Sequence, residues 1–148
     1  MLLRRDRAMI GIAIVLDVAF HAGVGAVVSA GEIAERIGQA RRGIEPVLQA
    51  LARAGLLSSV RGPRGGYRLG RPRRDLHLSA IVAAALEGDV DPPAPEGRLQ
   101  SAVLAPLWDE LDGLCRARLE ALTIDDLMKR ASSAGLQRPA PVPVDFAI

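Results

Sequence analysis

The sequence predicts a mainly α-helical fold with one small β-hairpin. Three short helical patterns precede a glycine-rich hairpin, and a second set of helical patterns follows it. The chain has 148 residues, of which 49% are hydrophobic, and these numbers are typical of a single domain with a real core. One cysteine allows no intrachain disulfide. The longest apolar run, residues 8–16, is shorter than the roughly 20 residues of a membrane span.

The first half of the chain carries three helical signals. Residues 6–22 form an apolar stretch that ends at a glycine. Ser29 and Glu32 have the spacing of a capping box, which predicts a second helix over residues 30–37. A third helix has apolar residues at i, i+3, i+4 and i+7, which should face inward, and its Pro46 should either bend it or delay its start to Arg42 or Gly43.

A hairpin follows the third helix. Residues 56–60 and 67–69 are predicted strands, joined by the turn Gly62-Pro63-Arg64-Gly65-Gly66. Three short helices followed by such a hairpin are the element order of a winged helix-turn-helix. In that fold, the second helix of the helix-turn-helix pair enters the DNA major groove. The turn links two strands and does not open a helix, so it is not a nucleotide-binding loop. Because no catalytic motif is present either, we expect a protein that is not an enzyme.

The second half should contain three more helices. Ser79 is expected to cap a compact helix over residues 80–87, and the proline-rich residues 88–97 should form a loop. A long helix is expected from about residue 98 to 122, kinked or restarted at Pro106.

Thr123 and the two acids that follow it predict a capped last helix that ends near residue 131. The proline-containing residues beyond it are expected to be a flexible tail. The predicted organisation is therefore a winged helix-turn-helix DNA-binding region over 1–78, a connecting helix, loop and further helices over 79–131, and the tail over 132–148. The family resemblance given below implies that the later helices of 79–131 are dimerisation helices.

Charge is divided unequally along the chain. Residues 1–75 hold 13 arginines and 6 acidic residues, whereas residues 76–148 hold 6 basic and 11 acidic residues. Arginine suits phosphate contacts because its planar guanidinium binds oxygens in pairs. A solvated charged face would explain the same asymmetry.

Several segments together point to a family. They are Leu16-Asp17-Val18-Ala19, Glu32-Ile33-Ala34-Glu35-Arg36, Leu48 to Leu51, Ala54-Gly55-Leu56, Val60-Arg61-Gly62-Pro63-Arg64-Gly65-Gly66-Tyr67-Arg68-Leu69, Leu107-Trp108-Asp109-Glu110-Leu111 and Thr123-Ile124-Asp125-Asp126-Leu127. Over roughly residues 2–131 the chain resembles the IscR/NsrR-type (Rrf-two) family of bacterial winged helix-turn-helix regulators. The resemblance implies a cytoplasmic, homodimeric, double-stranded-DNA-binding transcription factor, a repressor of a pseudo-palindromic operator, whose long helices cross. The alternative is a winged-helix module for protein association without specific DNA recognition.

The sequence departs from that family in three ways. Many members hold an iron–sulfur cluster on three cysteines in and beside the loop before the long helix, whereas residues 88–97 contain none here and Cys115 lies within the helix. We therefore expect no cofactor. Pro46 is the second departure. The third is that Ala40, Arg42 and Gly43 differ from the residues common in relatives, so the family's base preference does not transfer.

The DNA-contacting residues are expected on the third helix and the hairpin. Arg64, at the hairpin tip, can extend into a narrow minor groove together with Arg61, unless it is only a solvated turn residue. Glu45 and Gln49 can read bases or be ordinary surface residues. Tyr67 is expected to support the wing. The full expected set is Ser29, Gln39, Arg41, Arg42, Glu45, Gln49, Arg61, Arg64, Tyr67 and Arg68.

The predicted long helix has an apolar band too wide for a solitary exposed helix, and the resemblance implies that a second copy covers it. Cys115 in this band is either a small core hydrophobe or a thiol switch between subunits. His77 has no neighbouring ligands, so no metal is expected. The expected dimerisation set is Leu107, Trp108, Leu111, Leu114, Cys115, Leu119 and Leu122.

Basic residues at 4, 5 and 7 before the apolar run also fit the start of a signal peptide. Asp6 and Asp17 bracket that run, and no clean cleavage site follows it. A cytoplasmic helix is the interpretation we prefer.

Overall fold

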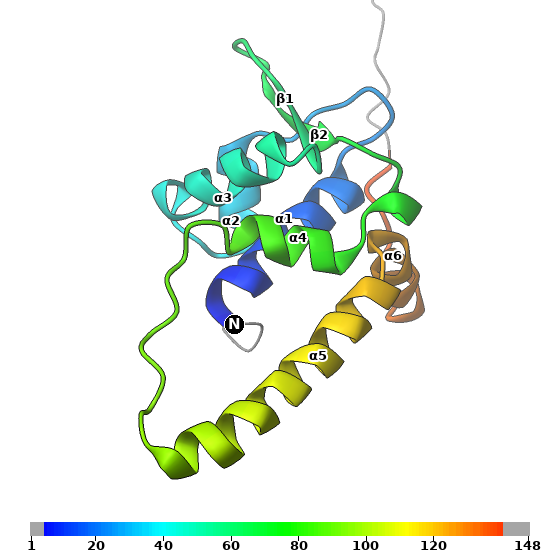
Figure 1. Cartoon of the computed structure of the whole chain (residues 1–148). Coiled ribbons are helices and arrows are strands. Elements are labelled where there is room, and N and C mark those ends of the chain that lie inside the picture. Colours follow the sequence, from blue (N-terminus) through cyan, green and yellow to red (C-terminus); the bar gives the residue numbers. More distant parts are fainter. Residues whose placement is uncertain (1–4, 141–148) are drawn as a thin grey trace, which may run out of the picture.

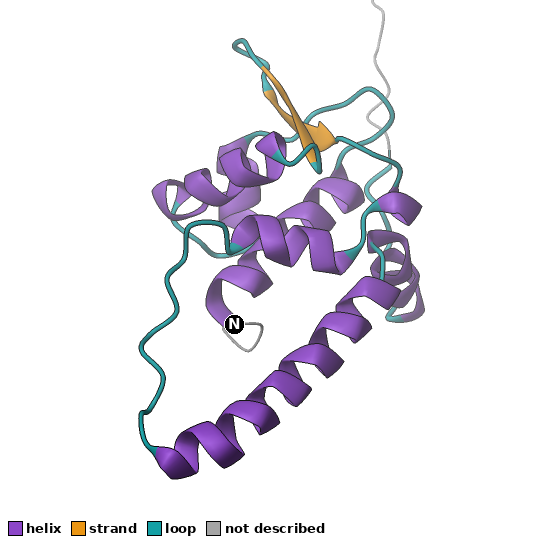
Figure 2. Ribbon diagram, viewed as in Figure 1, coloured by secondary structure: helices purple, strands orange, loops and turns teal. Residues whose placement is uncertain are grey.

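The computed structural model describes residues 5–140, and Figures 1 and 2 show its mainly helical architecture with one two-stranded hairpin. The prediction of this fold class is confirmed. The elements are α1 (Arg5–His21), α2 (Ala30–Arg36), α3 (Arg41–Arg53), β1 (Leu57–Val60), β2 (Gly66–Leu69), the 3₁₀ turn η1 (Arg73–Asp75), α4 (Leu78–Ala85), the π-helical segment η2 (Gln100–Leu104), α5 (Ala105–Ala121) and α6 (Ile124–Ser133).

The core is built around α1, which packs against α3, α4 and α6. Ile14, Val15 and Val18 of α1 are fully buried, and so are Leu48 of α3 and Ile81 of α4. Burying one such aliphatic side chain contributes about 1.5–3 kcal/mol. None of the helices within residues 5–140 is both long enough and apolar enough to cross a bilayer.

Two local caps form as predicted. The Ser29 hydroxyl oxygen accepts a hydrogen bond from the Glu32 amide at 3.2 Å, and the Glu32 carboxylate accepts one from the Ser29 amide at 2.8 Å. Hydrogen bonds that the Ser29 amide, the larger cause, and the Ser29 side chain donate to the Glu32 carboxylate lower the pKa of Glu32 below its usual value. Thr123 and Asp126 make the same reciprocal pair at the start of α6. Both helix starts are thus fixed by residues three apart in sequence.

The two helix-interior prolines are accommodated differently. α3 begins at Arg41, one residue before the earlier of the two delayed starts that the sequence predicts as the alternative to a bend, and Pro46 lies inside the helix. Pro46 removes one amide donor, but the helix is held by its buried inner face, which includes Ile44 and Val47. Before Pro106 the long helix widens into η2, where the Ala105 amide donates to the carbonyl of Gln100. α5 therefore restarts with Pro106 in its first turn, one of the two predicted outcomes.

The predicted cap of α4 is wrong. The helix begins at Leu78 with His77 at the N-cap position, and the Ser79 hydroxyl donates instead to the Glu120 carboxylate. The cause is a long-range pairing, because the Leu78 amide donates to the carbonyl of Leu122 at 2.9 Å. This pairing, with the His77–Thr123 bridge, joins the start of α4 to the chain after α5.

The hairpin is anchored to the loop that precedes α2. Within the described residues, Val28 and Tyr67 exchange two backbone hydrogen bonds, of 2.8 and 2.9 Å. Gly66 lies at this contact, where a Cβ atom would be 2.4 Å from the carbonyl oxygen of Val28. Only a glycine lets the two backbones approach so closely.

We expect Gly66→Ala to lower the free energy of unfolding by about 1–3 kcal/mol, the usual cost of forcing atoms into a packed site. Gly43→Ala is the matched control, because a Cβ at Gly43 meets nothing within 4 Å and α3 should gain about 0.5–1 kcal/mol from the better helix former. Urea unfolding of both variants is the measurement. Equal stability of the two would show that the Val28 contact is not tight.

α5 stands away from the helical body in Figure 1, connected to α4 by a long loop. None of its residues is buried. Leu104, at the end of η2, and Leu107, near the start of α5, are large apolar side chains exposed to solvent, and Leu114 follows further along α5 with 62% of its surface exposed. An exposed apolar band of this kind is typical of a surface that another molecule covers.

Candidate nucleic-acid interface

α2 and α3, joined by residues 37–40, form a helix-turn-helix pair. Gly38 in the turn has a positive φ of 68°, and the Gln39 amide donates to the carbonyl of Ala34 at 2.9 Å. This turn sets the direction in which α3 leaves α2.

α2 is held to α1 by an ion pair. Arg36 donates to both carboxylate oxygens of Asp17, at 2.9 and 2.8 Å, and the Asp17 side chain is only 8% exposed. The hydrogen bonds to Asp17 raise the pKa of Arg36 above its usual value. His21 on α1 lies 3.6 Å from the same carboxylate. A two-point bond of this kind fixes an angle as well as a distance.

α3 has one buried and one exposed face. Its apolar residues Ile44, Val47, Leu48 and Leu51 are buried, as their spacing predicts. The opposite face is polar and exposed along its length, where Arg41, Arg42, Glu45 and Gln49 lie. This face can reach a ligand without disturbing the core.

A hollow of about 480 Å³ lies between the start of α2, α3 and the hairpin. It brings together five of the predicted DNA-contacting residues from segments far apart in sequence, namely Ser29, Arg41, Glu45, Arg61 and Tyr67. The remaining five, Gln39, Arg42, Gln49, Arg64 and Arg68, are exposed but do not line it. Ser59, which the sequence did not predict as a site residue, also lines the hollow. It pairs with Tyr67 across the hairpin, so the register of the two strands is the signal that points to it.

The hairpin tip presents Arg64 to solvent. The Gly65 amide donates to the carbonyl of Gly62 at 2.9 Å, which closes a turn with Pro63 and Arg64 at its centre. Gly62 has φ of 118°, a conformation that favours glycine. Arg61 and Arg64 are both exposed, and the only acidic side chain lining the adjoining hollow is Glu45. An anionic backbone such as DNA suits this surface.

The predicted dimerisation residues divide into two groups. Leu107, Trp108 and Leu114 are exposed on α5, and Leu111 and Cys115 are half-buried. The other two, Leu119 and Leu122, pack against the core of their own chain, at the end where α5 meets α6. The described structure thus leaves most of the band open at the far end of the helix.

The loop between α4 and η2, where cluster-bearing relatives keep cysteines, offers no thiolate. Within residues 5–140, no three His, Cys, Asp or Glu side chains lie close enough to hold a metal ion. Cys115 lies in the middle of α5. The donor set does not fit a cysteine-ligated iron–sulfur cluster.

A helix-turn-helix pair with a polar outer helix face, next to a hairpin with an arginine at its tip, defines a winged-helix DNA-binding protein. The family model described as "Rrf2: Iron-dependent Transcriptional regulator" matches residues 5–130. The chain belongs to the Rrf2 family of transcriptional regulators, as the sequence resemblance predicts. This membership also agrees with the prediction that the protein is a regulator and not an enzyme.

Curated relatives support the same assignment. The chain is 35% identical over 119 residues to the HTH-type transcriptional regulator IscR of Photobacterium profundum, covering 77% of this chain and 68% of that protein. It is 36% identical over 104 residues to the putative HTH-type transcriptional regulator BadM of Rhodopseudomonas palustris, covering 69% and 67%.

Solved structures have the same fold. T. potens IscR matches with a TM-score of 0.70 and 28% identity, over 90% of this chain and 91% of that one. CymR of B. subtilis, described as its global cysteine regulator, matches with a TM-score of 0.68 and 27% identity, over 88% and 98%.

Proposed function

We propose that two copies of this chain join through α5 and bind a pseudo-palindromic operator as a cytoplasmic repressor that carries no iron–sulfur cluster. The single observation that carries this proposal is the arginine-bearing surface formed by α3, the hollow and the wing. α3 would enter the major groove and the wing would lie along the adjacent backbone. The two half-sites would be about 34 Å, or a multiple of it, apart.

We assign base-reading and phosphate-binding roles to different residues of this surface. Arg42, Glu45 and Gln49 lie along the exposed face of α3, where arginine can pair with guanine and a carboxylate can accept from cytosine. Arg41 and Arg61 line the hollow. From there they would bind phosphates, in place of the guanine contact that the sequence predicts for Arg41 and the minor-groove contact that it predicts for Arg61.

The open band on α5 supports the dimer. A monomer would leave Leu104, Leu107 and Leu114 in water, whereas two crossed α5 helices would cover them. A two-fold dimer uses the same face twice, which matches a symmetric operator.

The missing cysteine ligands support action without a cluster. We expect protein purified without oxygen to be colourless, with no iron in proportion to protein. Absorbance near about 400 nm that rises with bound iron would overturn this part of the proposal.

Selection of genomic fragments tests the function directly. Purified protein is incubated with fragmented genomic DNA and random competitor, and retained fragments are sequenced and titrated at increasing salt. A regulator retains a few fragments at physiological salt, and its affinity falls steeply as salt rises. Retention of no fragment above competitor would leave a protein-association module as the better explanation.

Arg64→Ala tests the wing. We expect operator binding to weaken by about 1–3 kcal/mol, the value of one good groove contact, while the dimer remains intact. Arg130→Ala on α6 removes the same charge away from the proposed interface and serves as control. Electrophoretic mobility shift titrations measure both. Wild-type affinity of the Arg64 variant would reject the role of the wing tip.

A further inference from the structure

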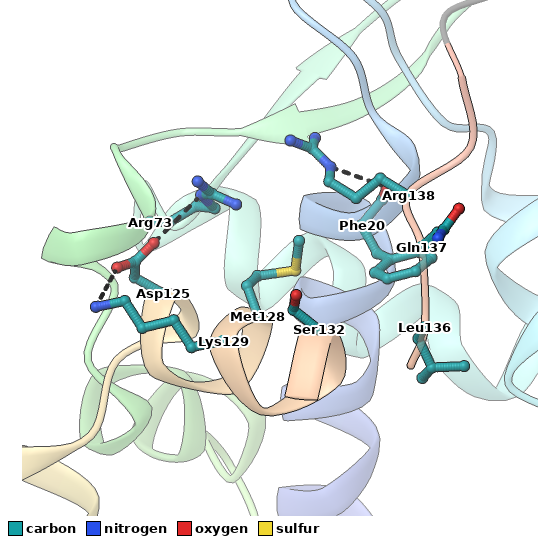
Figure 3. A pocket seen from close by; sticks show the side chains of 9 residues that line it. All are labelled: Phe20, Arg73, Asp125, Met128, Lys129, Ser132, Leu136, Gln137 and Arg138. Carbon is teal, nitrogen blue, oxygen red and sulfur yellow. Dashed lines mark hydrogen bonds and ion pairs between the residues drawn. The ribbon is translucent and has the colours of Figure 1, made fainter. Parts of the chain in front are cut away.

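A second hollow, of about 420 Å³, lies between the end of α1, η1, α6 and the segment after α6 (Figure 3). It is separate from the proposed DNA surface, since the two hollows share no lining residue. Its volume lies within the range of small-molecule sites, about 300–1,000 Å³. The proposed function leaves the signal that controls the regulator open, and this hollow bears on that question.

The hollow has an excess of positive charge. Arg73, Lys129 and Arg138 line it, and Asp125 is the only acidic side chain among the lining residues. The Asp125 carboxylate is shared between Arg73, at 3.6 Å, and Lys129, at 3.1 Å, as the dashed lines in Figure 3 mark. Arg73 and Lys129 therefore share one carboxylate, whereas Arg138 is directed at the carbonyls at the end of α1. An anion entering the hollow meets uncompensated charge.

Apolar side chains form the other part of the lining. Phe20 comes from α1, Met128 from α6 and Leu136 from the segment beyond it. Leu136 is 60% exposed although it is a large aliphatic side chain. An inorganic anion would use none of this surface, whereas an organic acid with an apolar body would cover it.

The wall contributed by the segment after α6 is fixed to α1. Arg138 donates to the carbonyls of Ala19 at 3.1 Å, Ala22 at 3.2 Å and Phe20 at 3.4 Å, at the C-terminal end of α1. A guanidinium suits the negative end of a helix dipole. Because Arg138 already holds this segment in place, ligand binding would not be weakened by the loss of conformational entropy that ordering the segment requires.

The walls of the hollow connect to the wing along the chain. Arg73 lies four residues after the end of β2 at Leu69. Ala22, held by Arg138, begins the loop that ends at Val28, which is bonded to Tyr67 of β2. A carboxylate that pairs with Arg73 would compete with Asp125 and so loosen η1 from α6.

We propose that this hollow binds a small organic acid with an apolar body, and that its occupancy changes the affinity of the wing and α3 for DNA. The effector role rests on the proposed regulatory function, whereas the ligand binding does not. Differential binding to two states is what such coupling requires.

The binding part is tested with 4-phenylbutyrate as probe, by isothermal titration of the full chain without DNA. Its uncharged amide should bind at least about tenfold more weakly, because the charged hydrogen bonds are lost. Lys129→Gln should weaken the acid about two- to fivefold, as an exposed ion pair does, and Ser132→Trp should fill the hollow and abolish binding. Arg130→Gln, the same charge change one residue away on α6, should leave binding unchanged.

Failure of the acid to bind, equal binding of acid and amide, or equal loss in the Lys129 and Arg130 variants would overturn the ligand assignment. The effector role is tested by operator titrations with and without saturating probe. We expect the operator affinity to change about threefold or more, and the probe affinity to change by the same factor when operator is present. An unchanged operator affinity with bound probe overturns the effector role, whereas absence of any operator binding overturns the proposed function and leaves the ligand titration valid.

Discussion

Replacing Leu107 and Leu114 together by aspartate is expected to convert the protein into a monomer and to weaken operator binding about 100-fold or more. The two side chains lie seven residues apart on one side of α5 and are both exposed within one chain, so the protomer should keep its fold. Joining two DNA-binding domains raises the affinity for a two-part operator by about 10²–10⁴ through effective concentration alone, and a monomer loses that gain. Sedimentation velocity and operator titration measure the two effects.

Arg116→Glu is the matched control. It makes the same total charge change as the two aspartates but lies on the opposite side of α5, where its side chain is 72% exposed. The control should stay dimeric with near wild-type affinity. A double aspartate variant that remained a dimer would mean that the chains associate through another surface.

Asp17→Ala should lower the free energy of unfolding by about 2 kcal/mol. It leaves Arg36 without its two-point partner, and removing one member of a fully buried pair costs about 3–5 kcal/mol. The cost is smaller here because the Arg36 side chain is 31% exposed and water can reach it. Urea unfolding gives the value, and Glu35→Ala, an exposed acid next to Arg36, is the control. A loss below about 0.5 kcal/mol, the level of a surface change, would contradict this account.

The features that the sequence predicted are those set by residues close together in the chain. The two capping boxes need only residues three apart, Ser29 with Glu32 and Thr123 with Asp126. The hairpin needs only its glycine-rich turn between two strands. Local rules of this kind were enough to place the helix-turn-helix and the wing.

The features that escaped prediction depend on residues far apart. Ser79 has the composition of a cap, but the pairing of Leu78 with Leu122 moved the helix start and left Ser79 to bond Glu120. The anchoring of Arg138 on α1 joins positions more than a hundred residues apart. The sequence predicted which residues lie on the exposed sides of the third helix and the hairpin. The spacing of residues along the chain did not indicate that Arg41 and Arg61 border one hollow.

The bonds between Val28 and Tyr67 have a consequence for the DNA that this protein can use. They tie the base of the wing to the loop entering α2, so the wing and α3 cannot shift independently. One base pair inserted between the DNA positions that the wing and α3 are proposed to contact would displace one contact by about 3.4 Å and about a tenth of a turn. Each half of the recognised sequence should therefore have an invariant internal length.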